Sequence, residues 1–318
     1  MAKTYIIGHQ KPDTDSVVAA LALAYLFEQD SSFGYDNVQA AIIEPINGET
    51  AYLLNRFKLP APQIISAQDI KPDDKIVLVD HNEESQRLVG LNPDQIVEIV
   101  DHHKVNLNLS QPIYLNFKTW GSSTSVVYFM MRQLGQTPIK PNQQLASLML
   151  AAILSDTVGF KSSTTTQTDI KLAHELADLA QIDDLDQLTL DIFKAKSDLT
   201  GLTPEQLVKN DYKIFKFAQK VLIGQLETVE QNSIIQKQKQ ELLKAMQVVK
   251  EQEQVDLIFL AITDILKVNT KLLILDSESE AVATAAFGGT VVNNVLDIGP
   301  KLSRKKDIAP QLEKSLMN

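Results

Sequence analysis

The sequence contains no cysteine and no apolar run long enough to cross a bilayer. Without cysteine, disulfides and thiolate metal sites are excluded, so any metal must be held by oxygen atoms and imidazole nitrogens. Basic residues are also in deficit, giving a formal net charge of −10. That balance disfavours nucleic acid as a partner, because nucleic-acid binding relies on Lys and Arg. The first residues lack an extended apolar signal region, which predicts a cytoplasmic protein with no membrane partner.

The length of 318 residues predicts about two domains. Short runs rich in Ile and Val alternate with helical patterns rich in Ala and Leu. The runs occupy residues 5–7, 38–43, 76–79 and 96–100, and the helical patterns 16–29, 122–134 and 142–154. Continuous apolar runs are typical of strands buried on both faces of a parallel sheet. The alternation predicts an α/β fold whose N-terminal domain has a central, mainly parallel sheet flanked by helices.

A smaller C-terminal α/β domain is predicted after a linker or hinge at residues 194–199. Helix-start signals follow the linker in Thr203-Pro204-Glu205. The expected domains are therefore residues 1–193 and 200–318. The second domain contains a polar helical pattern at 233–252 and strand candidates at 255–262 and 272–275.

The turn after the first predicted strand carries His9, Asp13 and Asp15 within seven residues. It leads into a predicted helix that Asp15 or Ser16 is placed to cap. In an open α/β sheet, ligands bind beyond the carboxyl ends of the strands. Three potential metal ligands at such an end therefore indicate a metal-dependent enzyme.

Asp80 and Asp101-His102-His103 follow two further predicted strands, and Asp156 ends a helical pattern. A lone Asp there is usually a helix cap or turn former, and a lone His is usually structural. However, four of the five histidines fall in the first turn or in these segments, and only His174 lies elsewhere, on a predicted surface helix. The four are His9, His81, His102 and His103. The combination predicts that Asp13, Asp15, Asp80, His102 and Asp156 converge at one sheet edge.

Mixed carboxylate and imidazole ligands favour a first-row divalent ion such as manganese, with cobalt or zinc as alternatives. The number of ligands indicates two ions, a common device in phosphoryl chemistry. A basic run, Ser303-Arg304-Lys305-Lys306, offers a grip for phosphate, although alone such a run is usually solvated surface. The segment Gly121–Ser125 is expected to be a plain helix cap, with phosphate binding as a weaker alternative.

Together these motifs resemble the family II, manganese-dependent inorganic pyrophosphatases of the DHH phosphoesterase superfamily. The matching segments are Gly-His-Gln-x-Pro-Asp-Thr-Asp at 8–15, Val-Asp-His-Asn-Glu at 79–83, Asp-His-His at 101–103, Ser-Asp-Thr at 155–157 and Ser-Arg-Lys-Lys at 303–306. They span nearly the whole chain and are specific as a set, whereas Asp-His-His alone would be a weak signal.

The resemblance implies a role for each matching residue. His9 and Asp13 would bind the first Mn²⁺, Asp15, His102 and Asp156 the second, and Asp80 both. His103 would face the substrate and help to protonate or stabilise the leaving phosphate. His81 and Asp101 would orient ligands through hydrogen bonds. Lys213, Arg304 and Lys305 would hold pyrophosphate, with Lys209 and Lys216 as alternatives to Lys213.

The implied reaction is hydrolysis of pyrophosphate to two phosphates by a hydroxide that bridges two Mn²⁺ ions per subunit. Cobalt is an alternative metal, and Mg²⁺ would arrive with the substrate in the cleft between the domains. The resemblance also implies a homodimer formed through the N-terminal domain. Only 20 residues separate Asp80 from Asp101, so we expect no regulatory nucleotide-binding insert between these motifs.

The alternatives are other enzymes and one binding module. DHH phosphodiesterases or nucleases carry a Gly-Gly-Gly-His motif, whereas Phe287-Gly288-Gly289-Thr290 lacks the His. Exopolyphosphatase activity on short chains needs only a more open pocket and stays open as a side activity. A phosphate-sensing module would be expected to have lost part of the ligand set, and no predicted ligand is missing.

Overall fold

The computed structural model describes residues 2–133, 138–199 and 201–317. Leu134, the predicted end of one helix, and Thr200, the predicted first residue of the second domain, lie outside these ranges. The chain divides into two compact units, Met1–Lys196 and Ser197–Asn318. The division falls inside the segment 194–199, whose first three residues end a helix of the first unit. The hinge role of this segment stays a prediction.

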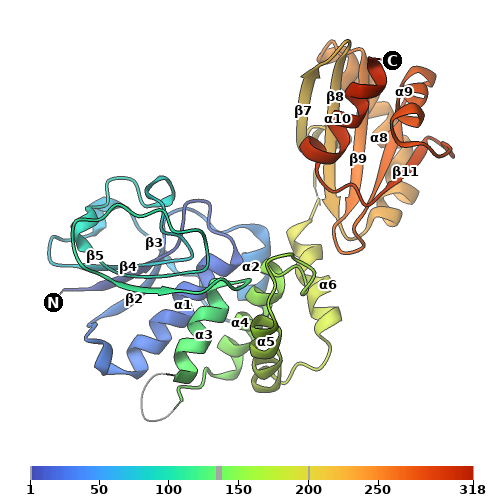
Figure 1. Cartoon of the computed structure of the whole chain (residues 1–318). Helices are drawn as coiled ribbons and strands as arrows, with labels where there is room; N and C mark the ends of the chain where they lie inside the picture. Colours follow the sequence, from blue (N-terminus) through green and yellow to red (C-terminus); the bar gives the residue numbers. More distant parts are fainter. Residues whose placement is uncertain (1, 134–137, 200, 318) are drawn as a thin grey trace. The chain divides into compact units, whose positions relative to one another are not determined.

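The described part of the first unit contains a six-stranded sheet in which every pairing is parallel (Figure 1). The strands are β1 (Thr4–Ile7), β2 (Val38–Ile42), β3 (Gln63–Ile64), β4 (Lys75–Val79), β5 (Ile96–Asp101) and β6 (Tyr114–Phe117). Their order is β3-β2-β1-β4-β5-β6. In the central strands β1 and β4 the apolar runs at residues 5–7 and 76–79 are buried, as the sequence predicted. The predicted α/β fold with a parallel sheet is therefore confirmed.

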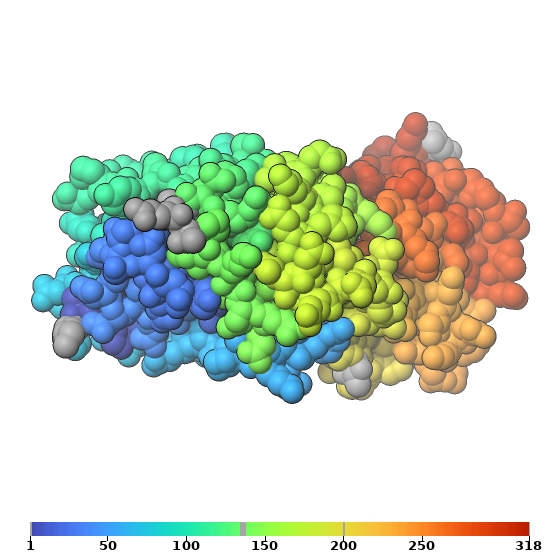
Figure 2. All heavy atoms as spheres, turned by 90° about the horizontal axis from the view of Figure 1, so that it is seen from below, coloured from blue at the N-terminus to red at the C-terminus, as the bar shows by residue number. Residues whose placement is uncertain are grey.

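Helices cover one face of this sheet, and Figure 2 shows their outer side in blue, green and yellow-green. The helices are α1 (Thr14–Gln29), α2 (Gly48–Arg56), α3 (Ser123–Gln133), α4 (Gln143–Asp156), α5 (Gln167–Ala180) and α6 (Leu185–Lys196). Apolar loop residues, including Leu88, Leu107 and Leu109, pack against the other face. Short 3-10 helices lie at Ser31–Phe33, Ala67–Asp69, Glu84–Gln86 and Pro93–Gln95.

The first helix differs from its prediction at its start. It begins at Thr14, and its N-cap is Asp13, whose Oδ1 accepts a hydrogen bond from the backbone N–H of Ser16 at 3.0 Å. The prediction that Asp15 or Ser16 caps this helix was therefore wrong. Asp13, Asp15 and Ser16 all suit an N-cap, and the sequence alone does not distinguish them.

The second unit contains a mixed sheet in the order β11-β10-β9-β8-β7. Its strands are β7 (Asp211–Lys216), β8 (Lys220–Thr228), β9 (Leu257–Asp264), β10 (Asn269–Ile274) and β11 (Val295–Gly299). The β8–β9 pair is parallel and the other pairs are antiparallel. The helices are α7 (Pro204–Val208), α8 (Gln231–Gln252), α9 (Ser277–Phe287) and α10 (Ala309–Leu316), with a π-helical turn at Arg304–Ile308. This unit confirms a second, smaller α/β domain.

The second sheet is buried on both faces. Leu222 and Ile262 point to the core that contains α7 and α8, whereas Ile223 and Phe259 point to the core beside α9 and α10. Alternate residues of a strand face opposite sides, so one apolar run supplies both cores. Within the described residues, no helix combines the length and the apolar character needed to cross a bilayer.

Candidate metal centre

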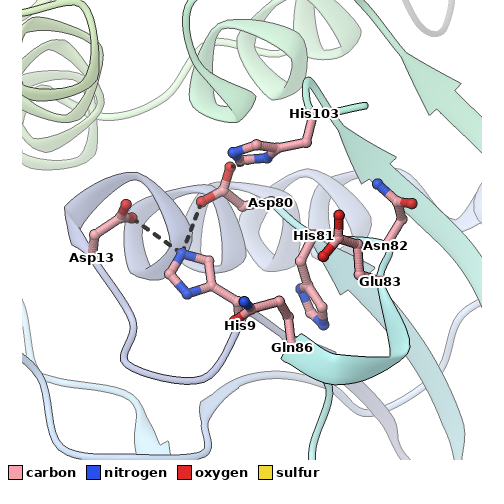
Figure 3. Close-up of a pocket in the computed structure, with 8 residues that line it drawn as sticks. All are labelled: His9, Asp13, Asp80, His81, Asn82, Glu83, Gln86 and His103. Atoms are coloured by element: carbon pink, nitrogen blue, oxygen red, sulfur yellow. Dashed lines mark ion pairs between the residues drawn. The ribbon is translucent and has the colours of Figure 1, made fainter. Parts of the chain in front are cut away.

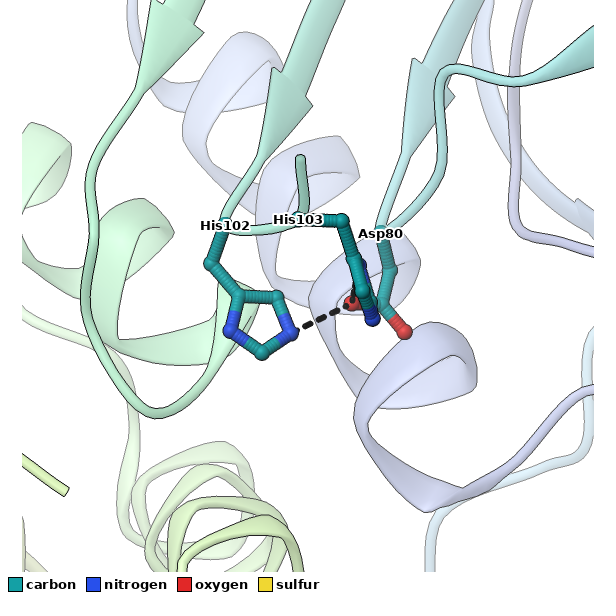
Figure 4. Close-up of side chains that lie close together, drawn as sticks. All are labelled: Asp80, His102 and His103. Atoms are coloured by element: carbon teal, nitrogen blue, oxygen red, sulfur yellow. Dashed lines mark ion pairs between the residues drawn. The ribbon is translucent and has the colours of Figure 1, made fainter. Parts of the chain in front are cut away.

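Three neighbouring strands of the first unit end at the same edge of the sheet. His9 lies two residues after β1, and Asp80 follows β4 directly. His102 and His103 follow β5, and Asp156 is the last residue of α4. Parallel strands align their carboxyl ends, so the topology brings together the side chains that follow β1, β4 and β5 (Figures 3 and 4).

The turn between β1 and α1 is closed tightly at Gly8. A Cβ atom at this position would lie 2.0 Å from the hydroxyl oxygen of Ser16, so a side chain does not fit there. That hydroxyl accepts a hydrogen bond from the backbone N–H of His9 at 3.1 Å. The close approach fixes His9 against the first turn of α1, where Asp13 and Asp15 lie.

Asp80 lies at the centre of the cluster. Its φ of 62° is in the left-handed region, which costs a non-glycine residue about 1–3 kcal/mol and is typical of functional sites. The side chain is buried, and its two oxygens face different imidazoles. Oδ2 lies 3.4 Å from Nε2 of His9, and Oδ1 lies 3.4 Å from Nε2 of His102 (Figures 3 and 4). This arrangement suits a carboxylate shared by two ions.

Backbone carbonyls orient two of these imidazoles. Nδ1 of His9 lies 2.7 Å from the carbonyl of Gln10, and Nδ1 of His102 lies 2.9 Å from the carbonyl of Trp120. A carbonyl only accepts, so both Nδ1 atoms donate and both Nε2 atoms are left toward the carboxylates. Among the described residues, Nε2 of His102 and Oδ1 of Asp80 are buried without a hydrogen-bond partner. Two potential ligand atoms that face each other without a hydrogen-bond partner fit a cation, which would replace the imidazole proton.

The structure brings together every residue predicted to bind metal. His9, Asp13 and Asp80 form one group of potential ligands, and Asp15, His102 and Asp156 form another. Within each group the donor atoms lie within 4.8 Å of one another. Asp80 also groups with His102 and His103, which connects the two sets. The geometry thus places two groups of potential cation ligands beside each other, with Asp80 in the first group and next to His102 of the second.

The carboxylates of the cluster are crowded with negative charge. Burial and the charge of Asp80 raise the pKa of Asp15 to about 7, and burial and the charge of Asp15 raise the pKa of Asp156 to about 9. Burial disfavours protonated His9, but Asp13 and Asp80 outweigh it and raise its pKa to about 11. Burial likewise opposes His102, and Asp80 outweighs it, raising the pKa to about 10. The imidazoles thus carry protons where a bound cation would place positive charge.

Asp15 makes a second set of contacts, with the start of α3. Its Oδ1 accepts from the hydroxyl of Ser122 at 2.6 Å and the N–H of Thr124 at 3.0 Å, and its Oδ2 accepts from the N–H of Ser123 at 2.6 Å. The helix dipole favours a negative charge at this point. Asp15 therefore occupies the N-terminus of α3, and the alternative that Gly121–Ser125 binds phosphate through these N–H groups is wrong.

Asp101 is the last residue of β5 and holds the segment that follows this strand. Its Oδ1 accepts from the N–H groups of His102 and His103 at 2.7 and 3.0 Å and lies 3.0 Å from Nδ1 of His103. Its Oδ2 accepts from Asn82 at 2.6 Å. The hydrogen bond from His103 raises the pKa of that imidazole. Asp101 thus contacts the ring of His103 and the backbone of both histidines, and its orienting role stays a prediction.

A cavity of about 300 Å³ opens beside the first ligand group (Figure 3). Its lining residues are His9, Asp13, Asp80, His81, Asn82, Glu83, Gln86 and His103. The ring of His103 is half exposed into it. His81 is buried, which lowers its pKa to about 4, and its Nδ1 lies 2.9 Å from the carbonyl of Val79. Among the described residues its Nε2 has no hydrogen-bond partner, so its predicted orienting role stays a prediction.

The predicted substrate-binding residues lie in the second unit. Lys213 and Lys305 are exposed, on β7 and on the turn before α10. Arg304 is 8% exposed, and its guanidinium donates to the carbonyl and the carboxylate of Asp211 at 2.5 and 2.8 Å. Asp211 and Lys213 share a face of β7 because alternate strand residues do so. This contact brings Arg304 beside the strand that carries Lys213.

Three residues have clear roles in this geometry: Asn82 and Glu49 were missed as functional candidates, and Ser122 was considered only within the helix cap predicted at Gly121–Ser125. Asn82 holds Asp101, Ser122 holds Asp15, and Glu49 accepts from hydroxyls on both sides of the cluster. Asn82 lies in the motif at residues 79–83, and that position is the only signal in the sequence that could have indicated its role. Glu49 lies in a first helical turn, where an acidic residue is unremarkable.

Comparison with known proteins agrees with this architecture. Residues 3–153 match the model of the DHH family, N-terminal domain, and residues 190–315 match the DHHA2 domain. The fold and the site therefore define a DHH-type protein with a DHHA2 second domain.

The chain is 37% identical over 315 residues to the "Probable manganese-dependent inorganic pyrophosphatase" of Deinococcus radiodurans, covering 97% of each chain. It is 35% identical to the "Manganese-dependent inorganic pyrophosphatase" of Methanocaldococcus jannaschii, covering 98% of each. A crystal structure from Methanococcus jannaschii, named for family II inorganic pyrophosphatase, matches with a TM-score of 0.61 and 34% identity over 99% of this chain and 100% of that chain. The chain belongs to the family of manganese-dependent, family II inorganic pyrophosphatases.

A second solved structure, an exopolyphosphatase-related protein from Bacteroides fragilis, matches with a TM-score of 0.51 and 15% identity. The match covers 99% of this chain and 92% of that one. Similarity at this level concerns the fold alone.

Proposed function

We propose that this protein hydrolyses inorganic pyrophosphate to two phosphates in a manganese-dependent reaction. The observation that carries the proposal is Asp80, whose two oxygens face His9 and His102 from the centre of two ligand groups. Full-length relatives with the same activity in their names support the substrate.

His9, Asp13 and Asp80 would hold one Mn²⁺, and Asp80 with Asp15, His102 and Asp156 would hold the other. When bound, two such ions lower the pKa of water and offset the negative charge of the substrate. Cobalt is an alternative because the same oxygen and nitrogen donors suit it. Mg²⁺ is proposed to enter with pyrophosphate.

The chain's own groups have separate tasks in the reaction. Asp101 keeps the ring of His103 oriented, and the exposed side of this ring faces the cavity. There His103 donates a proton or a hydrogen bond to the leaving phosphate. Lys213, Arg304 and Lys305 bind the phosphoryl oxygens and stabilise their charge. For Arg304 this requires its guanidinium to share, or leave, its contacts with Asp211.

The assay that tests the proposal measures phosphate release from pyrophosphate with Mn²⁺, with tripolyphosphate and a dinucleotide as competing substrates. We expect pyrophosphate to be cleaved fastest and the reaction to stop when EDTA removes the metal. Faster cleavage of tripolyphosphate would favour an exopolyphosphatase, and faster cleavage of the dinucleotide a phosphodiesterase. Replacing Mn²⁺ with Co²⁺ in the same assay tests the second metal.

The remaining elements of the proposal concern assembly and context. A homodimer through the first unit is supported by β6, an edge strand that exposes Tyr114 and Leu115. Light scattering in solution tests it, and a monomeric mass would contradict it. A cytoplasmic location and the lack of adenine-nucleotide control stay predictions. Fractionation tests the first, and assays with added AMP, ADP and ATP test the second.

A further inference from the structure

Glu49, in the first turn of α2, is a buried acidic residue that the proposed reaction does not use. Its Oε1 accepts hydrogen bonds from the hydroxyl of Thr14 at 2.7 Å and from the hydroxyl of Ser155 at 2.5 Å. Its Oε2 lies 3.5 Å from the ammonium of Lys196, the last residue of α6. One carboxylate therefore connects three separate helices to α2.

The two hydroxyl partners are immediate neighbours of predicted metal ligands. Thr14 lies between Asp13 and Asp15, and Ser155 precedes Asp156. Asp13 belongs to one ligand group, whereas Asp15 and Asp156 belong to the other. One oxygen of Glu49 thus joins Thr14, in the segment that supplies ligands to both groups, to Ser155, at the end of the helix that supplies Asp156.

Helix capping does not account for this placement. Asn47 is already the N-cap of α2 and accepts from the N–H of Thr50 at 2.8 Å. An acidic residue in the first turn gains about 0.3–1 kcal/mol from the helix dipole without being buried. Burying a carboxylate is costly unless hydrogen bonds and a countercharge compensate. The hydroxyls and Lys196 supply that compensation. Capping of α2 therefore does not explain why Glu49 is buried among these partners.

We propose that Glu49 is a positioning residue that holds Asp13, Asp15 and Asp156 in register for metal binding by fixing Thr14 and Ser155. This inference rests on the proposed function, because it assumes that the two ligand groups bind metal. Glu49 touches neither ion nor substrate in this role. Lys196 keeps the negative charge tolerable in the interior.

The first test compares Glu49→Leu with Glu49→Gln by calorimetric titration of Mn²⁺ in the absence of pyrophosphate. Glu49→Leu removes the shared acceptor, and loss of such supporting contacts typically weakens metal binding about 10- to 100-fold. Glu49→Gln keeps an oxygen that accepts from both hydroxyls, so we expect Mn²⁺ affinity near that of the wild type. A weakened Glu49→Leu that Glu49→Gln rescues supports the positioning role.

A matched control separates positioning from stability. Glu98 is equally buried in the first unit, at 3% exposed, and accepts from Tyr35 and Asn116 at 2.8 and 2.7 Å. We expect Glu98→Leu to lower the melting temperature of the metal-free protein without changing Mn²⁺ affinity. If Glu49 had only a structural role, Glu49→Leu would behave in the same way.

Ser155→Ala provides a gentler test that also decides the question if Glu49→Leu does not fold. Ser147, on the same helix, is equally buried, and its hydroxyl donates to the backbone carbonyl of Gln143 at 2.8 Å. We expect Ser155→Ala to weaken one of the two Mn²⁺ binding steps and Ser147→Ala to weaken neither. Wild-type Mn²⁺ affinity in Ser155→Ala would overturn the positioning role. Failure of the wild type to cleave pyrophosphate would instead overturn the proposed function, and the Mn²⁺ titrations would still judge Glu49.

Discussion

The first unit buries Asp15 and Asp80 and partly buries its other four candidate ligands, whereas the second unit leaves two of its three candidate cations exposed. Asp80 is 2% exposed, and carbonyls hold the rings of His9 and His102. Lys213 and Lys305 extend from the surface. A metal site needs several donors placed in advance, because each misplaced ligand costs affinity. A phosphate grip needs charge within reach, which flexible side chains supply.

The largest expected effect tests the buried side of this comparison. Asp80→Ala removes the carboxylate shared by both ligand groups, so Mn²⁺ binding and pyrophosphate hydrolysis should both be lost. Two-metal stabilisation contributes several kcal/mol, so we expect activity to fall by about 10³-fold or more. Calorimetry and phosphate release measure the two losses. Wild-type turnover in this variant would show that the site has been assigned to the wrong residues.

The exposed side of the comparison predicts a different pattern for Arg304→Ala. Removing one charge-stabilising donor typically costs about 10²- to 10³-fold in rate, so kcat/KM should fall by that order. Mn²⁺ affinity should not change, because Arg304 lies in the other unit. Lys306→Ala is the control for charge alone, since this exposed lysine has no proposed contact with substrate. Loss of Mn²⁺ binding in Arg304→Ala would contradict the division of labour.

The convergence of the candidate metal ligands was easier to predict than their surroundings. Apolar runs gave the central strands, and parallel topology then required Asp80, His102 and the turn at His9 to meet at one edge. The edge strands β3 and β6 were missed because they are short and largely exposed, so they carry no apolar run. The pattern of apolar residues thus indicates strands that are buried, and it does not reveal short strands that are exposed.

Residues that act through other residues left no such signal. Asp13, Asp15 and Ser16 all suit the N-cap of α1. Only the packing of α3 against α1 shows that Asp15 instead accepts hydrogen bonds at the start of α3. Glu49 likewise acts through hydroxyls that are 35 and 106 residues away in the sequence. Contacts of this length depend on tertiary packing, which local pattern does not specify.

Removing the metal should make the first unit sensitive to pH. The pKa values of His9 and His102 are raised to about 11 and about 10 in the folded state, so the stability they give is complete below about pH 6.5 and lost as pH rises through those values. The raised pKa values of Asp15 and Asp156, about 7 and about 9, act in the same direction. The melting temperature of metal-free protein should therefore fall between about pH 7 and pH 10.

Mn²⁺ should reverse this trend, because it competes with the protons on the same ligands. Each displaced proton makes affinity rise by about tenfold per pH unit below the pKa of that ligand. Thermal unfolding with EDTA and with Mn²⁺ at several pH values measures both effects. Stabilisation by Mn²⁺ that is equal at all pH values would contradict the protonated state of the histidines. Asp80→Ala should show no stabilisation at any pH.

The smallest expected effect concerns the contact between Asp15 and the start of α3. Ser122→Ala removes a hydroxyl that donates to Oδ1 of Asp15 at 2.6 Å, while the N–H groups of Ser123 and Thr124 continue to donate. A hydrogen bond contributes about 1 kcal/mol net, so Mn²⁺ affinity should fall about fivefold. Ser123→Ala is a matched control, since its buried hydroxyl has no hydrogen-bond partner among the described residues and its N–H contact is retained. Equal effects of the two substitutions would mean that helix packing, and not the hydroxyl, orients Asp15.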